Sequence, residues 1–548
     1  MMTVLSVMVR SVLVSQGQLA AEGSLRKALT RLYGGGRMSI NTKAILTRCI
    51  MRHATGAASF AILGVFLASP LHAQVTPEEV WQSWQSLGKS YGQTVSAEQV
   101  GRAGDTLVVS GMKTSMAQDG ATIDGRIEEV RFRDLGDGTV EVTMTDTYSI
   151  DMSVPGEEGN THDIAITIAQ PGLTLTAGGN AARTDYAYTA PSVTVDMQIR
   201  EDAVPLADVD ATLTGLSGSY AMDAGTELSA LDSALAIDSM TFTIAAGDAT
   251  NGATAVGSLA ALKLGSAGSF LGMDAVENMA QALRDGFSAD IDFSYGRGDF
   301  TLAAFDQGRA TKVGASNETG HFRALMGQEA LRYGAGGTGV SLVVSGDNIP
   351  FPELKLTFAE ASFDFLMPLL ASEMPTDFTF LTRIVDLTVS DEIWAMVDPT
   401  VALPRDPATV ILDTKGKVRL TSDLMDETAM EALGDRAPGE LHALDVTDLT
   451  VKFAGAELTG TGGLTFDNSD LTSFDGIPAP TGTFDLLIRG GNGLLDRLVT
   501  MGVVPQGQAM GARMMIAMLA KPGDGPDVLT STLEFRDKGF YANGQRLK

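Results

Sequence analysis

The sequence contains little cysteine and no long apolar run. Its one cysteine, Cys49, lies among the first 73 of the 548 residues, so the remainder of the chain can form no disulfide and no thiolate metal site. The longest uncharged apolar run, residues 57–68, has about a dozen residues, whereas a helix needs ~20 to cross a bilayer. Beyond residue 73 we therefore expect no transmembrane span, and stability must come from burial and hydrogen bonding.

Basic residues are also scarce, with 39 Lys and Arg against 67 Asp and Glu. Eight of these basic residues and a single acid, Glu22, precede residue 74. The 31 basic and 66 acidic residues that remain give residues 74–548 a formal charge of −35. Such a surface repels phosphate backbones, so we expect no nucleic-acid partner. The same charge favours solubility and resists association.

Residues 38–73 have the three parts of a signal peptide. Lys43, Arg48 and Arg52 precede the apolar run, and residues 71–73, which end in the small Ala73, offer a cleavage site after it. This order predicts export to the periplasm, with cleavage after Ala73; an uncleaved anchor is the alternative. Because a signal normally begins at the initiator methionine, we expect translation to start at Met38 and residues 1–37 to be a mis-annotated extension.

No catalytic, cofactor or metal signature stands out, and we predict no site residues, no cofactor and no enzymatic activity. The histidines after residue 73 are widely separated, and we expect surface or turn positions for His162, His321 and His442. Residues 334–339 match the dinucleotide-binding glycine string, but a strand follows them where the motif needs a helix. Two acidic loops, 467–470 and 523–527, lack calcium-motif spacing and are interpreted as solvated turns.

The chain after residue 73 opens with a predicted helix. Thr76 can cap it, Pro77 suits its first position, and Glu79 completes a capping box. Val80, Trp84, Leu87 and Tyr91 recur at helical spacing, with Trp81 beside them. We expect this amphipathic helix to close one end of the core.

Beyond residue 106 the apolar period becomes two, which indicates strands with one dry and one wet face. Val140, Val142 and Met144 alternate with polar residues, and Asp137-Gly138 predicts a hairpin turn before them. The same alternation recurs at 164–168, 193–199, 240–244, 291–295, 354–358, 449–453, 484–488 and 533–535. We predict a mainly β protein of long, curved or partly closed antiparallel sheets with a few helices.

Helical spacing interrupts this pattern at residues 274–284, at 322–333, and in a predicted hairpin near 493–520. The second arm of the hairpin is rich in methionine, a side chain that adapts to varied apolar partners. Either it packs on the sheet, or it is a lid or lipid-facing element. Residues 339–346 echo 105–111, so we expect two related β-rich halves, 74–320 and 321–548.

Three stretches of the sequence, together with Trp81 and Trp84, are similar to a known protein family. These stretches are residues 394–409, 490–498 and 543–547. They resemble the family known as domain of unknown function 2125, which consists of exported bacterial envelope proteins. The resemblance implies a Gram-negative envelope location over nearly all of the chain after residue 73. That family has no established activity, so it implies no site residues.

Two functions follow as hypotheses. One is a periplasmic protein that binds lipid or another hydrophobic ligand in an apolar groove. The other is a structural or protein-interaction module of the envelope, with a protein partner and no ligand. A hydrolase or metalloenzyme would need a polar pocket where histidines and carboxylates converge.

Overall fold

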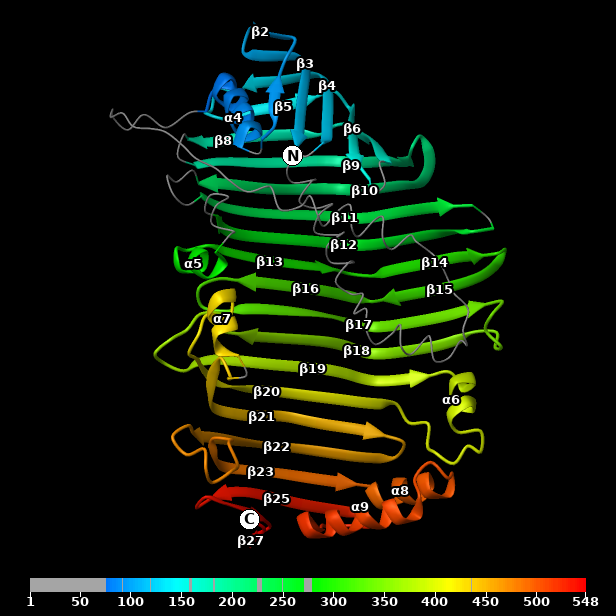
Figure 1. Cartoon of the computed structure of the whole chain (residues 1–548). Helices are drawn as coiled ribbons and strands as arrows, with labels where there is room; N and C mark the ends of the chain where they lie inside the picture. Colours follow the sequence, from blue (N-terminus) through cyan, green and yellow to red (C-terminus); the bar gives the residue numbers. More distant parts are fainter. Residues whose placement is uncertain are drawn as a thin grey trace.

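The computed structural model describes residues 75–90, 92–118, 120–156, 160–180, 183–223, 229–248, 250–270, 278–434 and 436–548. The predicted extension (1–37) and signal peptide (38–73) lie outside these residues. In the described part, one antiparallel sheet of 27 strands runs the length of the molecule, with helices at its ends and along its sides (Figure 1). The expectation of a mainly β, antiparallel fold is confirmed.

The elements of the first half are α4 (Pro77–Ser90), β1 (Thr94–Ser96), β2 (Gln99–Ala103), β3 (Thr106–Gln118), β4 (Ala121–Asp134), β5 (Val140–Met144), β6 (Thr147–Pro155), β7 (Thr161–Ala169), β8 (Thr174–Asn180), β9 (Arg183–Glu201), β10 (Val204–Asp223), β11 (Ser229–Gly247), β12 (Gly252–Phe270), α5 (Met279–Arg284), β13 (Ser288–Tyr295), β14 (Gly298–Asp306) and β15 (Arg309–Asn317).

The elements that follow are β16 (Thr319–Met326), β17 (Leu331–Gly346), β18 (Leu354–Met367), β19 (Thr376–Val389), α6 (Asp391–Val397), β20 (Ala408–Leu420), α7 (Glu427–Leu433), β21 (Gly439–Phe453), β22 (Ala456–Asp467), β23 (Ala479–Arg489), α8 (Gly491–Thr500), α9 (Gln506–Leu519), β24 (Lys521–Pro522), β25 (Val528–Arg536), β26 (Gly539–Ala542) and β27 (Gln545–Arg546).

The sheet is an up-and-down meander in which long strands pair with their neighbours in sequence. Some rungs consist of two short strands end to end: β13 and β14 pair along the single strand β12, and β15 and β16 pair along β17. β5 with β6, and β7 with β8, occupy rungs between β4 and β9 in the same way. Short strands, β1 with β2 at one edge and β26 with β27 at the other, limit edge pairing with other chains.

A kink line crosses the sheet where these double rungs break. On five of the continuous strands it falls on a residue with positive φ: Gly111 (60°), Gly215 (65°), Ala261 (53°), Gly339 (59°) and Asp386 (53°). The apolar period of two shifts by one residue there. In β10, for example, Val209, Ala211 and Leu213 precede the kink, and Leu216 and Tyr220 follow it. The shift keeps the apolar side chains on one face along the whole strand.

The N-terminal end of the sheet curls around a closed core. Phe132, Val130, Val142 and Leu175 are fully buried there, and α4 lays Trp81 and Trp84 against the Phe132 ring at centroid distances of 6.1 and 5.2 Å. The predicted capping box is present, since the Glu79 amide donates to Thr76 Oγ1 (3.3 Å) and the Thr76 amide to Glu79 Oε2 (2.9 Å). The predicted role of this helix, closing one end of the core, matches its contacts. Leu87's side chain and Tyr91 lie outside the described residues.

Of the three later helical segments predicted, one is confirmed, one is confirmed in part and one is wrong. The hairpin near 493–520 is confirmed as α8 and α9, and α5 confirms the end of the helix expected at 274–284; residues 274–277 lie outside the described residues. The prediction of a helix at 322–333 is wrong, because these residues belong to β16 and β17 and to the turn at Gly327 that joins them. Phe322 and Met326 are four apart, and that spacing places two side chains on one face of a strand as well as of a helix.

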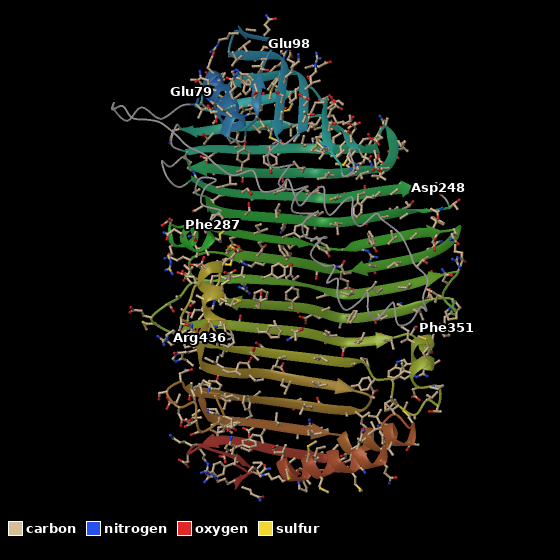
Figure 2. The ribbon with its side chains drawn as sticks, in the orientation of Figure 1. Glu79, Glu98, Asp248, Phe287, Phe351 and Arg436 are labelled. Carbon is tan, nitrogen blue, oxygen red and sulfur yellow. The ribbon has the colours of Figure 1, made fainter. Side chains whose placement is uncertain are left out.

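The two expected halves stay a prediction. Hydrogen bonding is continuous through the proposed boundary, since Thr319–Met326 of β16 pairs with β13 on one side and with β17 on the other. Two helices, α6 and α7, were not anticipated. Figure 2 places Phe287 and Arg436 at one end of the long strands and Asp248 and Phe351 at the other.

Candidate ligand-binding face

An apolar face extends across the C-terminal part of the sheet. Ile384 of β19 lies opposite Val410 of β20, and Val410 lies opposite Val451 of β21. We call the larger residues aligned in this way the apolar face: Ile291, Phe293, Tyr295, Phe322, Tyr333, Phe363, Phe365, Phe380, Ile384, Val410, Leu412, Val446, Leu449, Val451, Leu458, Phe484, Leu486, Ile488, Leu529 and Leu533. They form three rows over ten successive rungs, from β13 to β25.

No side chain of the apolar face is buried. Phe380 is 42% exposed and Ile384 is 36% exposed, whereas Phe132 in the N-terminal core is 0% exposed. Where the apolar face begins, aromatic rings contact one another across strands, with Tyr333 centred 5.2 Å from Phe322 and 5.5 Å from Phe363. These rings cover each other only in part. The sheet therefore has an apolar surface that no other part of the described chain covers.

The opposite face of the same strands is polar. Cross-strand ion pairs join Arg323 to Asp290 (2.9 Å), Arg332 to Asp364 (3.0 Å), Arg383 to Glu360 (3.0 Å), Arg419 to Glu440 (2.7 Å) and Arg489 to Glu457 (3.2 Å). Such pairs, each half exposed, add little stability individually. Together they identify this side as the one that faces water, so the apolar face is the side available to an apolar ligand.

The size of the apolar face follows from strand geometry. Ten rungs about 4.8 Å apart give a length of roughly 43 Å, and three rows two residues apart give a width of roughly 14 Å. One leaflet of a bilayer's hydrocarbon core is roughly 15 Å thick. The face can therefore hold more than one extended acyl chain end to end.

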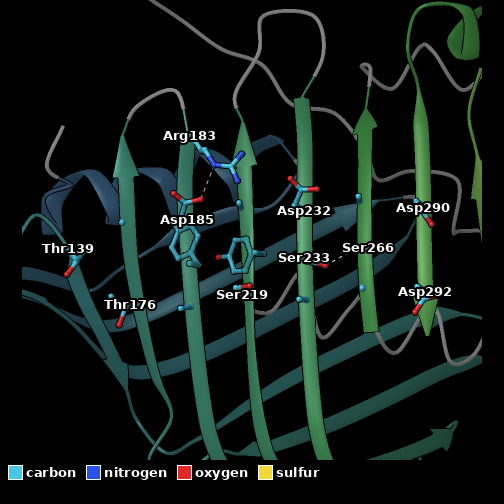
Figure 3. Close-up of a pocket in the computed structure, with 18 of the residues that line it drawn as sticks. Thr139, Thr176, Arg183, Asp185, Ser219, Asp232, Ser233, Ser266, Asp290 and Asp292 are labelled. Atoms are coloured by element: carbon cyan, nitrogen blue, oxygen red, sulfur yellow. Dashed lines mark hydrogen bonds and ion pairs between the residues drawn. The ribbon is translucent and has the colours of Figure 1, made fainter. Parts of the chain in front are cut away.

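A depression of about 730 Å³ lies on the polar face of β8–β13 (Figure 3). Small residues such as Ala187, Ser219 and Gly265 form its floor, and Asp185, Asp232, Asp290 and Asp292 surround them. Arg183 pairs with Asp185 at 3.1 Å. The trough has an acidic rim and is open to solvent, whereas small-molecule pockets are typically enclosed clefts.

The histidines do not converge. His162 in β7 is buried, so its expected surface or turn position is wrong; His321 in β16 is exposed, and His442 in β21 is half-buried, 3.5 Å from Glu440. All three lie within strands. Across the described ranges, no group of three or more His, Cys, Asp or Glu residues could hold a metal ion. The glycine string 334–339 lies inside β17, where residues 334–338 pair with β16 and β18.

The carboxylates of the two acidic loops accept hydrogen bonds that hold neighbouring parts of the chain together. Asp470 accepts from Ser473 Oγ (2.7 Å) and Lys538 Nζ (2.8 Å), and the Lys538 ammonium is the main reason why its pKa lies well below the usual range. Asp527 accepts from the amides of Asn492 (3.1 Å) and Gly493 (2.8 Å) at the start of α8. Both loops thus fasten neighbouring elements.

Asp398 organises the loop after α6. Its carboxylate is fully buried and accepts from the amides of Ala402 (3.0 Å) and Leu403 (2.7 Å) and from Thr400 Oγ1 (3.0 Å). The Ala402 amide, followed by that of Leu403, lowers the pKa of Asp398. The residue belongs to one of the stretches, 394–409, on which the family resemblance depends.

A family model described as "Uncharacterized protein conserved in bacteria (DUF2125)" matches residues 395–544. The chain resembles that family across this C-terminal region. The match contains most of the three resembling stretches, whereas Trp81 and Trp84 lie outside it, so similarity over nearly the whole chain is not found. No curated protein and no solved structure matches the chain. In space the match covers the strands from β20 to β26, with α7, α8 and α9.

Proposed function

We propose that this protein is exported to the periplasm and binds lipid, or another long apolar molecule, along its apolar face, without catalysing a reaction. The supporting observation is the face itself: twenty large apolar side chains on one side of ten rungs, none of them buried, with ion pairs on the other side. Apolar surface gains about 25 cal/mol per Å² when it leaves water. An apolar occupant would remove this surface from water, which favours its binding.

Export is inferred from sequence. Residues 38–73 have the basic, apolar and small-residue segments of a cleavable signal. Within the described residues, no helix is long and apolar enough to cross a membrane. A periplasmic location would give the apolar face access to lipids in transit through an aqueous compartment.

Native mass spectrometry of the protein purified from its own envelope tests the proposal. We expect bound lipid in the wild type and its loss in a Phe380→Asp/Ile384→Asp double variant. Thr379→Asp is the matched control, because Thr379 lies on the polar face of the same strand. Recovery without ligand, together with a stable protein partner in cellular crosslinking, would instead support a structural module of the envelope. Equal lipid retention in the double variant and the control would overturn the assignment of the face.

A further inference from the structure

The hairpin of α8 and α9 exposes an apolar helix at the C-terminal end of the sheet (Figure 1). Met510, Met514, Met515 and Met518 of α9 are 63%, 69%, 62% and 61% exposed, and only Ala509 of that helix is buried. Val503, in the turn before α9, is also 61% exposed. A soluble helix normally turns such residues inward.

This helix also differs from the rest of the molecule in charge. Residues 501–520 contain no Asp or Glu, and their single charged residue is Arg513. Arg513 forms an ion pair with Asp496 of α8. The chain from residue 74 carries an excess of 35 acidic side chains, which repel anionic lipid headgroups over most of the surface. α9 is a place where that repulsion is absent and apolar contact is available.

The distribution of the methionines around α9 favours a lipid phase over a single protein surface. At 100° per residue, their positions spread over about 140° of the helix circumference. A stripe of about 100° is enough to pack a helix on one neighbouring element. Flexible thioether side chains over a wider arc suit a fluid, irregular environment. With 14 residues, α9 is about 21 Å long, so it would lie in an interface and not span the bilayer.

The hairpin is fastened to the sheet at the end of the apolar face. Gly490 follows Ile488 of that face by two residues, and its amide donates to the Asp527 carbonyl (2.9 Å). At the other end of the hairpin, Asn543 Nδ2 donates to the Leu519 carbonyl (2.9 Å). In addition, α8 contacts β22, and β24, which directly follows α9, pairs with β25. The hairpin therefore keeps a set position at the end of the apolar face.

We propose that α9 docks the protein on a phospholipid bilayer, lying in the interface with its methionines among the acyl chains. Docking rests on the helix alone. That the bilayer is also the source of the lipid for the apolar face rests on the proposed function. The two claims are separable, because they depend on different side chains.

Flotation with vesicles of phosphatidylethanolamine and phosphatidylglycerol tests docking. The full exported chain should float with the vesicles, and a Met514→Asp/Met515→Asp variant should partition about a hundredfold less, since each buried methionine contributes about 1.5 kcal/mol or more. The matched Met514→Leu/Met515→Leu variant should still float. Because both methionines are exposed, thermal unfolding of the variants should be unchanged.

The outcomes separate the two proposals. Phe380→Asp/Ile384→Asp should float normally even though it loses bound lipid. Vesicle binding by the Met514→Asp/Met515→Asp variant equal to that of the wild type would overturn docking by α9. So would wild-type protein that ignores vesicles and forms a dimer, in light scattering, that the same aspartates abolish; α9 would then bind a second copy of the chain.

Discussion

Gly215 of β10 and Asp238 of β11 face each other at the kink line so closely that a β-carbon on Gly215 would lie 2.0 Å from Asp238 Oδ2. The φ of Gly215 is 65°, in the left-handed region. The same arrangement recurs along the line, where a β-carbon on Gly111 would meet the Glu98 side chain at 2.7 Å and one on Gly339 would meet Glu318 at 2.6 Å. An acidic side chain thus covers a glycine where the apolar period shifts.

Gly215→Ala should destabilise the protein by about 2 kcal/mol, because a left-handed conformation costs an L-residue about 1 kcal/mol and the new methyl group would displace Asp238. Urea unfolding followed by circular dichroism measures the change. Gly265→Ala in β12 is the control, since its φ is not positive and no atom lies within 4 Å of its β-carbon position. Equal stability of the two variants would contradict the structural role of the kink line.

Truncation of Phe132 should destabilise the protein much more than truncation of Phe380. Phe132→Ala removes a fully buried ring and should cost about 3–5 kcal/mol. Phe380→Ala removes a ring that is 42% exposed and should cost less than about 1.5 kcal/mol in ligand-free protein. Urea unfolding of both variants distinguishes an open face from a closed core, and similar losses would mean that the apolar face is packed inside the protein.

Asp398 predicts a pH dependence. Its pKa is lowered in the folded protein, so its stabilising contribution is complete above the unfolded carboxyl's usual value, near 3.8, and is lost as pH falls through the folded value. The difference in unfolding free energy between wild type and Asp398→Asn should be largest at neutral pH and shrink below about pH 4. Unfolding titrations at several pH values measure it. Asp391→Asn, which alters an exposed carboxylate, should differ little from wild type at every pH.

The α4 capping box offers a smaller test. Thr76→Ala removes the hydroxyl that accepts from the Glu79 amide and should cost about 1 kcal/mol. Because Trp81 and Trp84 lie on this helix, tryptophan fluorescence reports its release from Phe132. Thr76→Ser retains the acceptor and should unfold like wild type. A Thr76→Ser loss as large as that of Thr76→Ala would contradict capping by the hydroxyl.

The strand pattern was predictable from sequence because a sheet with one apolar face and one polar face requires apolar and polar residues to alternate along each strand. Val140, Val142 and Met144 and the later alternating segments all lie in strands. The kink line was missed, although its signal is present: in β11 the apolar positions pass from Leu235 and Ile237 to Met240 and Phe242, a shift by one residue. A one-residue break in the alternation looks like the end of a strand. Here it marks a bulge, which keeps the apolar side chains on one face.

The candidate face could be anticipated only in part. Sequence indicated a dry side on the strands, but whether another layer covers it depends on long-range packing. The N-terminal strands, closed around Phe132, and the C-terminal strands, open at Phe380, have the same alternation. Short helices such as α7 could not be predicted from apolar periodicity either, because seven residues complete barely two helical turns.

Photolabelling with a diazirine-bearing phospholipid, followed by peptide sequencing, tests the open apolar face most directly. Label should fall on the apolar-face residues Phe380 and Ile384 of β19 and Val410 and Leu412 of β20, and an excess of unmodified lipid should compete for it. The polar-face residues Thr379 and Arg383 should stay unlabelled. Label spread equally over both faces, or confined to α9, would contradict the account.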